Sequence, residues 1–260
     1  RVLLGHGEGG NCPGAVFTVD RVLECPGMYR AYGDARTHLG AGAGAVILGA
    51  VPFDHADAQV VYGVNHADVT VANKVVSATS CTTHCIAPLL AILDQQFGVE
   101  QVLMKEVHAY TSDQSLLDHV HRDLRRGRAA AQNIVPTTSS AIGSVQKVLP
   151  QLADRISGDS IRVPTLNVAL VDLTLKLRKT PTVVELNTLF ERMAHDSNGL
   201  IGFNDEPLVS SDFNHRAESA IYDATQTRVQ GDLVHIVAWY DNEWGYANRL
   251  LDWLTYLASQ

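Results

Sequence analysis

The chain has 260 residues, of which 46% are hydrophobic and 18% charged, and its formal net charge is −8 at pH 7. This composition is typical of a globular protein with a sizeable core and excludes a disordered chain. The negative charge argues against nucleic acid as a partner. No apolar run has the length of a membrane span. The four scattered cysteines are too few for a disulfide framework. We therefore expect a cytoplasmic protein.

The first 80 residues predict short strands and one helix. Apolar runs between turn residues predict strands at 16–25, 45–51, 59–64 and 74–80, and a short helix at 33–44 that ends in glycines. Alternation of strands with helices is typical of a parallel sheet.

From residue 81 the pattern changes to longer helices and strands. The spacing of Ile86, Leu89, Leu90 and Leu93 predicts a helix of about four turns. After it we expect a strand at 101–111, a polar arginine-rich connection at 112–137, a helix through Ile142, Val145 and Leu149 that ends at Pro150, and long strands within 161–177. Alternating apolar residues in those strands indicate an antiparallel sheet.

The last third of the chain predicts two more helices and two more strands. Thr182 and Glu185 have the spacing of a capping box, and the helix that follows carries Leu186, Phe190 and Met193 on one face. Strands are predicted at 219–229 and 233–240, before a final helix with Leu250, Leu251, Leu254 and Leu257 on one face.

The segment SCTTHC, residues 80–85, places two cysteines four residues apart where the long helix begins. A structural zinc site needs four ligands, and no second cysteine pair exists to complete one. Cys85 fits a buried core thiol. Cys81 lies in the first turn, where the helix dipole favours a thiolate, and His108 ends the next strand as a candidate base. Spacing alone leaves a core thiol and a nucleophile both open for Cys81.

An ordered set of motifs extends from about residue 20 to the C-terminus. The set comprises SCTTHC, VHAYTSDQ, DLRRGRAAAQNIVPTT, RVPTLNVALVDLT, SDFNH and WYDNEWGYANR. In this order the chain resembles the glyceraldehyde-3-phosphate dehydrogenase family, including the related erythrose-4-phosphate dehydrogenases. The resemblance implies an α/β Rossmann-like parallel sheet for NAD, truncated at its N-terminus, in residues 1–80 and joined by the C-terminal helix 243–260. It implies an α+β catalytic domain with a mostly antiparallel sheet in residues 81–242.

The resemblance also implies roles for the two central residues. Cys81 would attack the substrate aldehyde, and His108 would activate the thiol and stabilise its thiolate as an imidazolium. Oxidation would then leave a thioester on Cys81, which inorganic phosphate cleaves to an acyl phosphate or water cleaves to an acid.

Two anions would be held beside this pair. By resemblance, the substrate phosphate is bound by Thr111, Arg126 and Arg162, and the attacking phosphate by Ser80, Thr82, Ser139 and Ser140. Arginine matches phosphate geometry with two parallel hydrogen bonds, although Arg126 also fits an ordinary surface or interface arginine. Ser140 replaces a usual glycine, which could shift phosphate affinity or favour hydrolysis.

The cofactor residues are less complete than the catalytic ones. Asn242 matches the asparagine that binds the nicotinamide carboxamide, although it also fits a turn residue, and Tyr246 packs nearby in the family. His84 replaces a usual asparagine, and we expect it to be a tolerated polar neighbour. Metal ligands are not expected.

The N-terminal part departs further from the family pattern. Gly5, Gly7 and Gly10 have GxGxxG spacing, but no helix is predicted after them, so a glycine-rich loop is favoured over a dinucleotide site. Pro26 stands where serine or threonine is usual, and Gly44 where lysine or arginine is usual. We expect that an N-terminal cofactor segment is missing from this chain, or that the chain is a fragment or a degenerate paralogue.

The resemblance implies an NAD-dependent, phosphorylating oxidation of glyceraldehyde 3-phosphate. The alternatives are oxidation of erythrose 4-phosphate with water as acceptor, and a non-catalytic remnant that no longer binds NAD. The polar segment 112–137 packs at a subunit interface in the family, so we expect a homotetramer, or a dimer if the truncation is real.

Overall fold

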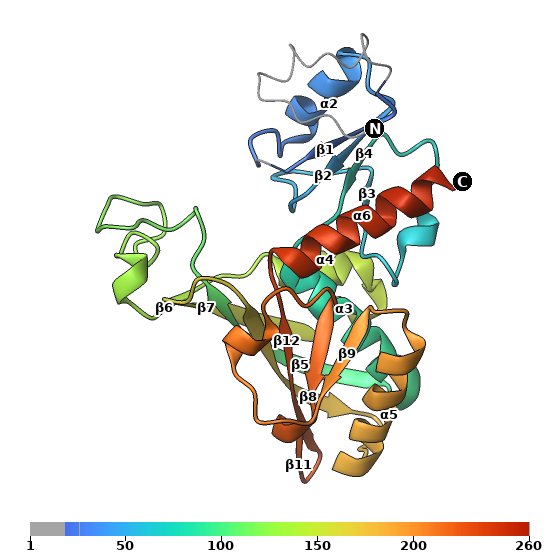
Figure 1. Ribbon diagram of the computed structural model, residues 1–260, viewed down its shortest axis with the longest axis vertical. Coiled ribbons are helices and arrows are strands. Elements are labelled where there is room, and N and C mark those ends of the chain that lie inside the picture. Colours follow the sequence, from blue (N-terminus) through green and yellow to red (C-terminus); the bar gives the residue numbers. More distant parts are fainter. Residues whose placement is uncertain (1–18, 26, 260) are drawn as a thin grey trace. The chain divides into compact units, whose positions relative to one another are not determined.

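The computed structural model describes residues 19–25 and 27–259, and the chain divides into two compact units, Arg1–Ser80 and Cys81–Gln260 (Figure 1). The glycine run at 5–10 and Pro26 lie outside the described residues. The final helix lies in the second unit, so its assignment to the cofactor domain stays a prediction. None of the helices in the described part combines the length and hydrophobicity that a membrane span requires.

The described strands of the first unit form a four-stranded sheet in the order β1-β2-β4-β3, and all of its pairs are parallel. The elements are β1 (Arg21–Glu24), α2 (Tyr32–Gly40), β2 (Ala45–Leu48), β3 (Ala58–Gln59), a short 3-10 turn at His66–Asp68, and β4 (Val75–Ser77). Helix α2 packs Ala35 against Val46, Leu48 and Val75. The predicted parallel sheet is confirmed.

The strand predicted at 59–64 is wrong beyond its first residue. Asn65 accepts a hydrogen bond from the Val61 N–H through its side chain, and the Asn65 N–H donates to the Val61 carbonyl. The asparagine therefore turns the chain and ends the strand, although the apolar run continues.

The second unit is built on a mixed sheet. Among the described residues its path is β6-β7-β5-β8-β12-β10-β9, with β11 paired to β12. The strands are β5 (Val99–Ala109), β6 (Val135–Thr137), β7 (Ile156–Val163), β8 (Ala169–Leu177), β9 (Ile201–Asn204), β10 (Ala220–Asp223), β11 (Arg228–Gln230) and β12 (Leu233–Tyr240). Only β5–β7 and β9–β10 are parallel among these described pairs, so the predicted, mostly antiparallel sheet is confirmed.

Helix α3 (Cys81–Phe97) lies across this sheet, where it contacts β5, β8, β10 and β12 (Figure 1). Its predicted apolar residues, Ile86, Leu89, Leu90 and Leu93, are fully buried. The sheet presents alternate residues to the helix: Met104 on β5, Leu173 on β8 and Ile236 on β12 are buried. The core thus fixes the first turn of α3 against one face of β5.

Three other helices complete the unit: α4 (Ala141–Val148), α5 (Val183–Asp196) and α6 (Trp244–Ala258), with 3-10 turns at Ala130–Gln132, Pro150–Leu152, Ser210–Phe213 and Ala224–Gln226. The predicted capping box at Thr182 and Glu185 is present. The single strand expected at 219–229 is wrong, because Asp223 caps a 3-10 turn that separates β10 from β11. Leu251 is 55% exposed, so its predicted place on the apolar face of α6 is wrong.

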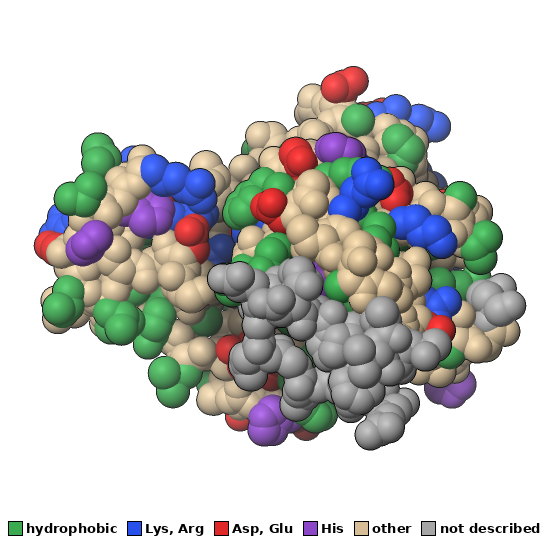
Figure 2. Space-filling view, turned by 90° about the horizontal axis from the view of Figure 1, so that it is seen from above, with side chains coloured by type: hydrophobic (Ala, Val, Ile, Leu, Met, Phe, Trp, Pro, Cys, Tyr) green, Lys and Arg blue, Asp and Glu red, His purple; other side chains and the backbone are tan. Residues whose placement is uncertain are grey.

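The connection between β5 and β6 projects from the unit and carries hydrophobic side chains on its surface (Figures 1 and 2). The exposed large residues of this segment are Leu116, Leu117, Val120, Leu124 and Ile134. A surface of this kind is typical of a contact between proteins.

Candidate active site

Cys81 and His108 come together because of where α3 and β5 begin and end. Cys81 is the first residue of α3, and His108 is the penultimate residue of β5 on the face that α3 covers. The Cys81 Sγ atom lies 3.6 Å from His108 Nε2. This distance allows proton transfer between the thiol and the ring without a bridging water.

Arg162 holds the other side of the imidazole. It is the register partner of His108 in the parallel β5–β7 pair, and its Nη1 atom lies 2.9 Å from His108 Nδ1. The Ala109 carbonyl oxygen lies 2.7 Å from the same ring nitrogen. Nδ1 can serve only one of these partners, because arginine has donors alone and a carbonyl oxygen only accepts. In the tautomer in which Nδ1–H donates to the Ala109 carbonyl, Arg162 Nη1 donates to the same carbonyl at 3.3 Å, and Nε2 carries the lone pair that faces Cys81, as a base requires.

Electrostatics favours a neutral pair rather than the thiolate and imidazolium that the sequence led us to expect. Burial, followed by the charge of Glu106, raises the pKa of the Cys81 thiol to about 11, although Thr82 and Arg162 act in the opposite direction. Burial and the charge of Arg162 lower the pKa of His108. Burial of the sulfur and the nearby carboxylate thus oppose the ionisation that the helix dipole favours, and the ionised thiol stays a prediction.

Glu106 is the main residue of this site that sequence reasoning missed. It is 1% exposed and accepts a hydrogen bond of 2.5 Å from the Thr82 hydroxyl at Oε1, which also lies 4.0 Å from His108 Nε2. The Tyr240 hydroxyl lies 2.9 Å from Thr82 Oγ1 and completes a buried network. The sequence could have indicated this residue, because Glu106 and His108 are two residues apart on one predicted strand and must therefore lie on the same face of the sheet.

All four residues predicted to hold the attacking phosphate lie near the start of a helix. Thr82 is buried in the first turn of α3, where its hydroxyl lies 4.0 Å from the Cys81 sulfur. Ser139 accepts a hydrogen bond from the Ala141 N–H, and Ser140 is exposed as the N-terminal flanking residue of α4. Ser80 directly precedes Cys81.

Arg126, by contrast, is engaged in a cluster of its own. Its guanidinium donates to Thr137 Oγ1 at 2.8 Å and the Thr138 carbonyl at 3.0 Å, and it pairs with Asp113. Thr111 is exposed two residues beyond the end of β5. Phosphate binding at Arg126 would therefore compete with the Asp113 carboxylate.

Asn242 and Tyr246 lie at the start of the final helix. The turn that carries Asn242 is held by Asp241, whose carboxylate accepts hydrogen bonds from the N–H groups of Glu243, Trp244 and His215. Asn242 Oδ1 is buried and has no hydrogen-bond partner among the described residues. An amide oxygen without a hydrogen-bond donor can accept a hydrogen bond from a carboxamide N–H₂ group such as that of nicotinamide.

Tyr246 contacts α3, the helix that begins at Cys81. Its ring meets the ring of His84 edge-on, with centroids 5.5 Å apart. His84 is itself buried one turn after Cys81, so its role as a neighbour of the cofactor residues is packing with an aromatic ring.

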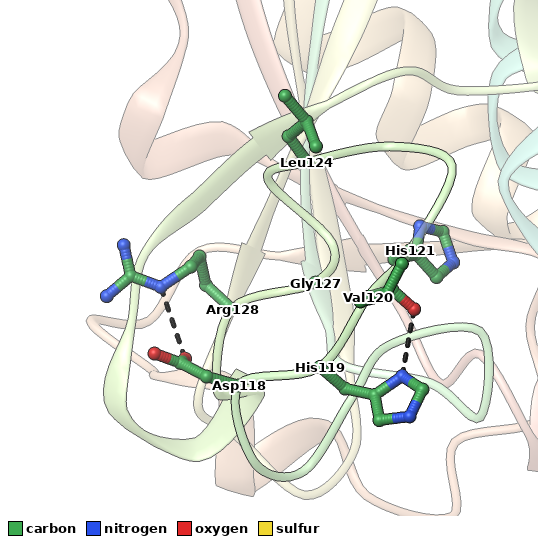
Figure 3. Close-up of a pocket in the computed structure, with 7 residues that line it drawn as sticks. All are labelled: Asp118, His119, Val120, His121, Leu124, Gly127 and Arg128. Carbon is green, nitrogen blue, oxygen red and sulfur yellow. Dashed lines mark hydrogen bonds and ion pairs between the residues drawn. The ribbon is translucent and has the colours of Figure 1, made fainter.

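A separate pocket of about 520 Å³ lies within the projecting connection (Figure 3). Its lining residues are Asp118, His119, Val120, His121, Leu124, Gly127 and Arg128. The segment folds back on itself through an ion pair of 3.1 Å between Arg128 Nε and Asp118 Oδ1 (Figure 3). No predicted catalytic residue lines it, and no group of three or more His, Cys, Asp or Glu side chains in the described residues could hold a metal ion.

Comparison with known proteins gives a consistent result. Residues 80–242 match the family of the glyceraldehyde 3-phosphate dehydrogenase C-terminal domain. A glyceraldehyde-3-phosphate dehydrogenase of Pseudomonas aeruginosa is 47% identical over 90% of this chain and 70% of that protein. The corresponding protein of Zymomonas mobilis is 43% identical over 96% of this chain and 75% of its own length, and one from Bacillus cereus is 44% identical over 95% and 75%.

Proposed function

This chain belongs to the glyceraldehyde-3-phosphate dehydrogenase family, and from that premise we propose that it is an NAD-dependent oxidoreductase that oxidises the aldehyde of glyceraldehyde 3-phosphate through a thioester on Cys81. The observation that carries the proposal is the distance of 3.6 Å between Cys81 Sγ and His108 Nε2 at the start of α3.

His108 acts as the base for the first step. Because both groups are neutral near pH 7, the thiol proton moves to Nε2 as the sulfur attacks the carbonyl carbon. While the ring holds this proton, the Glu106 carboxylate stabilises the imidazolium by Coulomb attraction. Nε2 then gives the proton to the former carbonyl oxygen, which completes the hemithioacetal and leaves the ring neutral.

The oxidation itself needs a cofactor, which Asn242 and Tyr246 would help to hold. The buried Asn242 oxygen without a donor fits the nicotinamide carboxamide. When bound, NAD supplies the acceptor for the hydrogen and electron pair that leave the substrate carbon. His108 takes up the alcohol proton in the same step and releases it to solvent before the thioester is cleaved.

The substrate phosphate has a cationic partner close to the reacting atoms. Arg162 is adjacent to His108, and Thr111 and Arg126 follow in the connection after β5. Binding of a phosphate at Arg162 would offset its positive charge and make the neighbouring ring a stronger base. The phosphate of the substrate would thereby assist the chemistry at its aldehyde.

The acceptor that cleaves the thioester is a separate question. The family resemblance alone implies inorganic phosphate, bound by Ser80, Thr82, Ser139 and Ser140, which gives an acyl phosphate. Water at the same carbon gives the acid, as in the related erythrose-4-phosphate dehydrogenases.

The decisive experiment measures NADH formation from glyceraldehyde 3-phosphate, with arsenate or phosphate present, by the purified chain. Cys81→Ser should abolish turnover, whereas Cys85→Ala, which removes the buried thiol one turn further along α3, should retain it. Full activity of Cys81→Ser would exclude the mechanism. Erythrose 4-phosphate, assayed in parallel, tests the alternative substrate.

Calorimetry with NAD tests the possibility of a non-catalytic remnant. Saturable binding to this chain, weakened in Asn242→Ala, is expected for the enzyme. No binding, together with no turnover, is the result that favours the remnant.

We also propose a homo-oligomer, a tetramer as in the family. The exposed apolar side chains of the projecting connection support an interface there. Light scattering coupled to size exclusion would give the mass, and Leu117→Asp should lower it if this surface is the contact.

A further inference from the structure

Glu106 is a buried carboxylate within the proposed catalytic site, where the proposed oxidation uses it only to stabilise the His108 imidazolium. It lies on the same face of β5 as His108 and is 1% exposed. Oε1 accepts the Thr82 hydroxyl, while Oε2 is buried without a hydrogen-bond partner among the described residues. Such an unsatisfied oxygen is costly to keep and calls for an explanation in terms of function.

The side chain carries a negative charge near neutral pH. Burial opposes its ionisation, but the charge of His108 when the ring is protonated, the charge of Arg162 and the nearby hydroxyls of Thr82 and Ser139 outweigh burial and lower the pKa of the carboxyl. A fixed carboxylate therefore lies beside the hydroxyls that the resemblance assigns to an attacking phosphate.

This arrangement occupies the hydroxyl hydrogen that a phosphate would need as a hydrogen-bond donor. The Thr82 hydrogen is donated to Glu106 Oε1 and is not available to a second anion. Oε1 and the Cys81 sulfur both lie within 4.0 Å of Thr82 Oγ1, so a phosphate placed to attack an acyl group on that sulfur would approach a like charge in a buried site. Water meets no such repulsion.

We propose that Glu106 makes water, rather than inorganic phosphate, the acceptor of the acyl group on Cys81. The inference rests on the thioester proposed above. The water oxygen bonds to the acyl carbon while one water proton moves to His108 Nε2, and the carbon–sulfur bond then breaks. The sulfur leaves as a thiolate and recovers that proton from Nε2, so thioester and water become acid and thiol.

Glu106 acts in this step as a positioning residue. Its Oε1 atom lies 4.0 Å from Nε2, where its charge stabilises the imidazolium that forms. A purely structural carboxylate would support Thr82 and Tyr240 without affecting the choice of acceptor. Glu106→Gln distinguishes the two, because glutamine keeps the size and can still accept from Thr82 but lacks the charge.

The experiment avoids any need for NAD or for the natural substrate. p-Nitrophenyl acetate transfers its acetyl group to a reactive thiol and releases coloured p-nitrophenolate, so the full chain can be acetylated directly. Intact-mass spectrometry should find one acetyl group that is absent in Cys81→Ser. After removal of the ester, loss of the acetyl group is followed in potassium chloride and in potassium phosphate of equal ionic strength.

For the unmodified chain we expect the same rate of loss in both salts and acetate as the product. In Glu106→Gln the rate in chloride should fall about tenfold or more, because an imidazolium is no longer stabilised, and phosphate should now accelerate loss with acetyl phosphate as product. Glu100→Gln, the same change at an exposed position of β5, should behave like the unmodified chain.

The possible failures are distinguishable. If Cys81 is not acetylated at all, the proposed nucleophile and this inference both fail. If Cys81 is acetylated and phosphate accelerates its deacylation in the unmodified chain, the nucleophile stands and phosphate is the acceptor. If Glu106→Gln changes neither rate nor product, the carboxylate is structural and the inference is overturned.

Discussion

Arg162 Nη1 lies 2.9 Å from His108 Nδ1, across the parallel register that pairs these residues on β7 and β5. Burial is the main cause that lowers the pKa of His108, and a permanent cation in this place adds to it because it disfavours a second positive charge beside the ring. The same cation acts on Cys81 in the direction of a lower thiol pKa. One side chain thus influences both members of the proposed catalytic pair.

The first prediction concerns removal of that cation. In Arg162→Gln the pKa of His108 should rise, because protonation no longer places two positive charges side by side. The shift should appear as a change in the midpoint of the His108 ring signals when NMR spectra are recorded against pH. Arg192→Gln, an exposed charge change on α5, is the matched control and should leave the midpoint unchanged. An unmoved His108 midpoint in Arg162→Gln would rule out the electrostatic coupling.

The second prediction concerns the reactivity of Cys81 against pH. With a thiol pKa of about 11, only about one Cys81 side chain in 10,000 is ionised at pH 7, and the thiolate fraction grows with every step in pH up to that value. Alkylation by iodoacetamide, mapped to Cys81 by peptide mass spectrometry, should therefore accelerate steadily to high pH. A plateau reached near pH 6 would instead reveal a preformed thiolate.

The pH dependence of Cys81 alkylation should also change when Glu106 is replaced. Its negative charge raises the pKa of the Cys81 thiol, so Glu106→Gln should move the profile to lower pH and speed alkylation at pH 8. The exposed variant Glu100→Gln should superimpose on the unmodified chain. Equal rates for all three proteins would show that the carboxylate does not act on the sulfur.

The sequence was sufficient to predict that Cys81 and His108 meet. A helix that starts at Cys81 and a strand that ends near His108 bring the two residues to one edge of the packed layers, and the 3.6 Å distance agrees. Their catalytic roles stay a prediction. Their charge state depends on burial of the sulfur and on Glu106, which both raise the pKa of the thiol, and local motif reading did not consider Glu106.

The errors in the fold have a common cause. Apolar runs predicted the strands β8 and β12 well, since a long strand is fixed by many sheet neighbours. They failed where one polar side chain redirects the backbone, as Asn65 does after β3 and Asp223 does after β10. Such turns are specified by single hydrogen bonds, which compete with the apolar pattern around them.

The third prediction concerns the capping box of α5. The Thr182 hydroxyl accepts from the Glu185 N–H, and the Glu185 carboxylate accepts from the Thr182 N–H at 2.7 Å. Thr182→Ala should lower the free energy of unfolding by about 1 kcal/mol in urea titrations. Thr188→Ala, on an exposed position of the same helix, should be neutral or slightly stabilising because alanine is the better helix former. Similar losses in both variants would exclude capping as the cause.

The fourth prediction connects sheet packing to the site. Gly158 on β7 is the register partner of Met104 on β5, and a Cβ atom at Gly158 would overlap the Met104 carbonyl oxygen and lie 2.9 Å from Met104 Cβ. Gly158→Ala must push the two strands apart, so we expect unfolding to become easier by about 1–3 kcal/mol. Gly143→Ala, in α4 with no described atom within 4 Å of the added carbon, should instead stabilise by about 0.5–1 kcal/mol.

The displacement should also reach His108. The pair of His108 and Arg162 lies four residues further along these strands than Met104 and Gly158, so separation of the strands draws the guanidinium away from the ring. In Gly158→Ala the pKa of His108 should therefore rise in the same direction as in Arg162→Gln, as measured by the same NMR titration. A destabilised protein with an unchanged His108 midpoint would mean that the strain relaxes locally and that the position of Arg162 does not depend on the packing at Gly158.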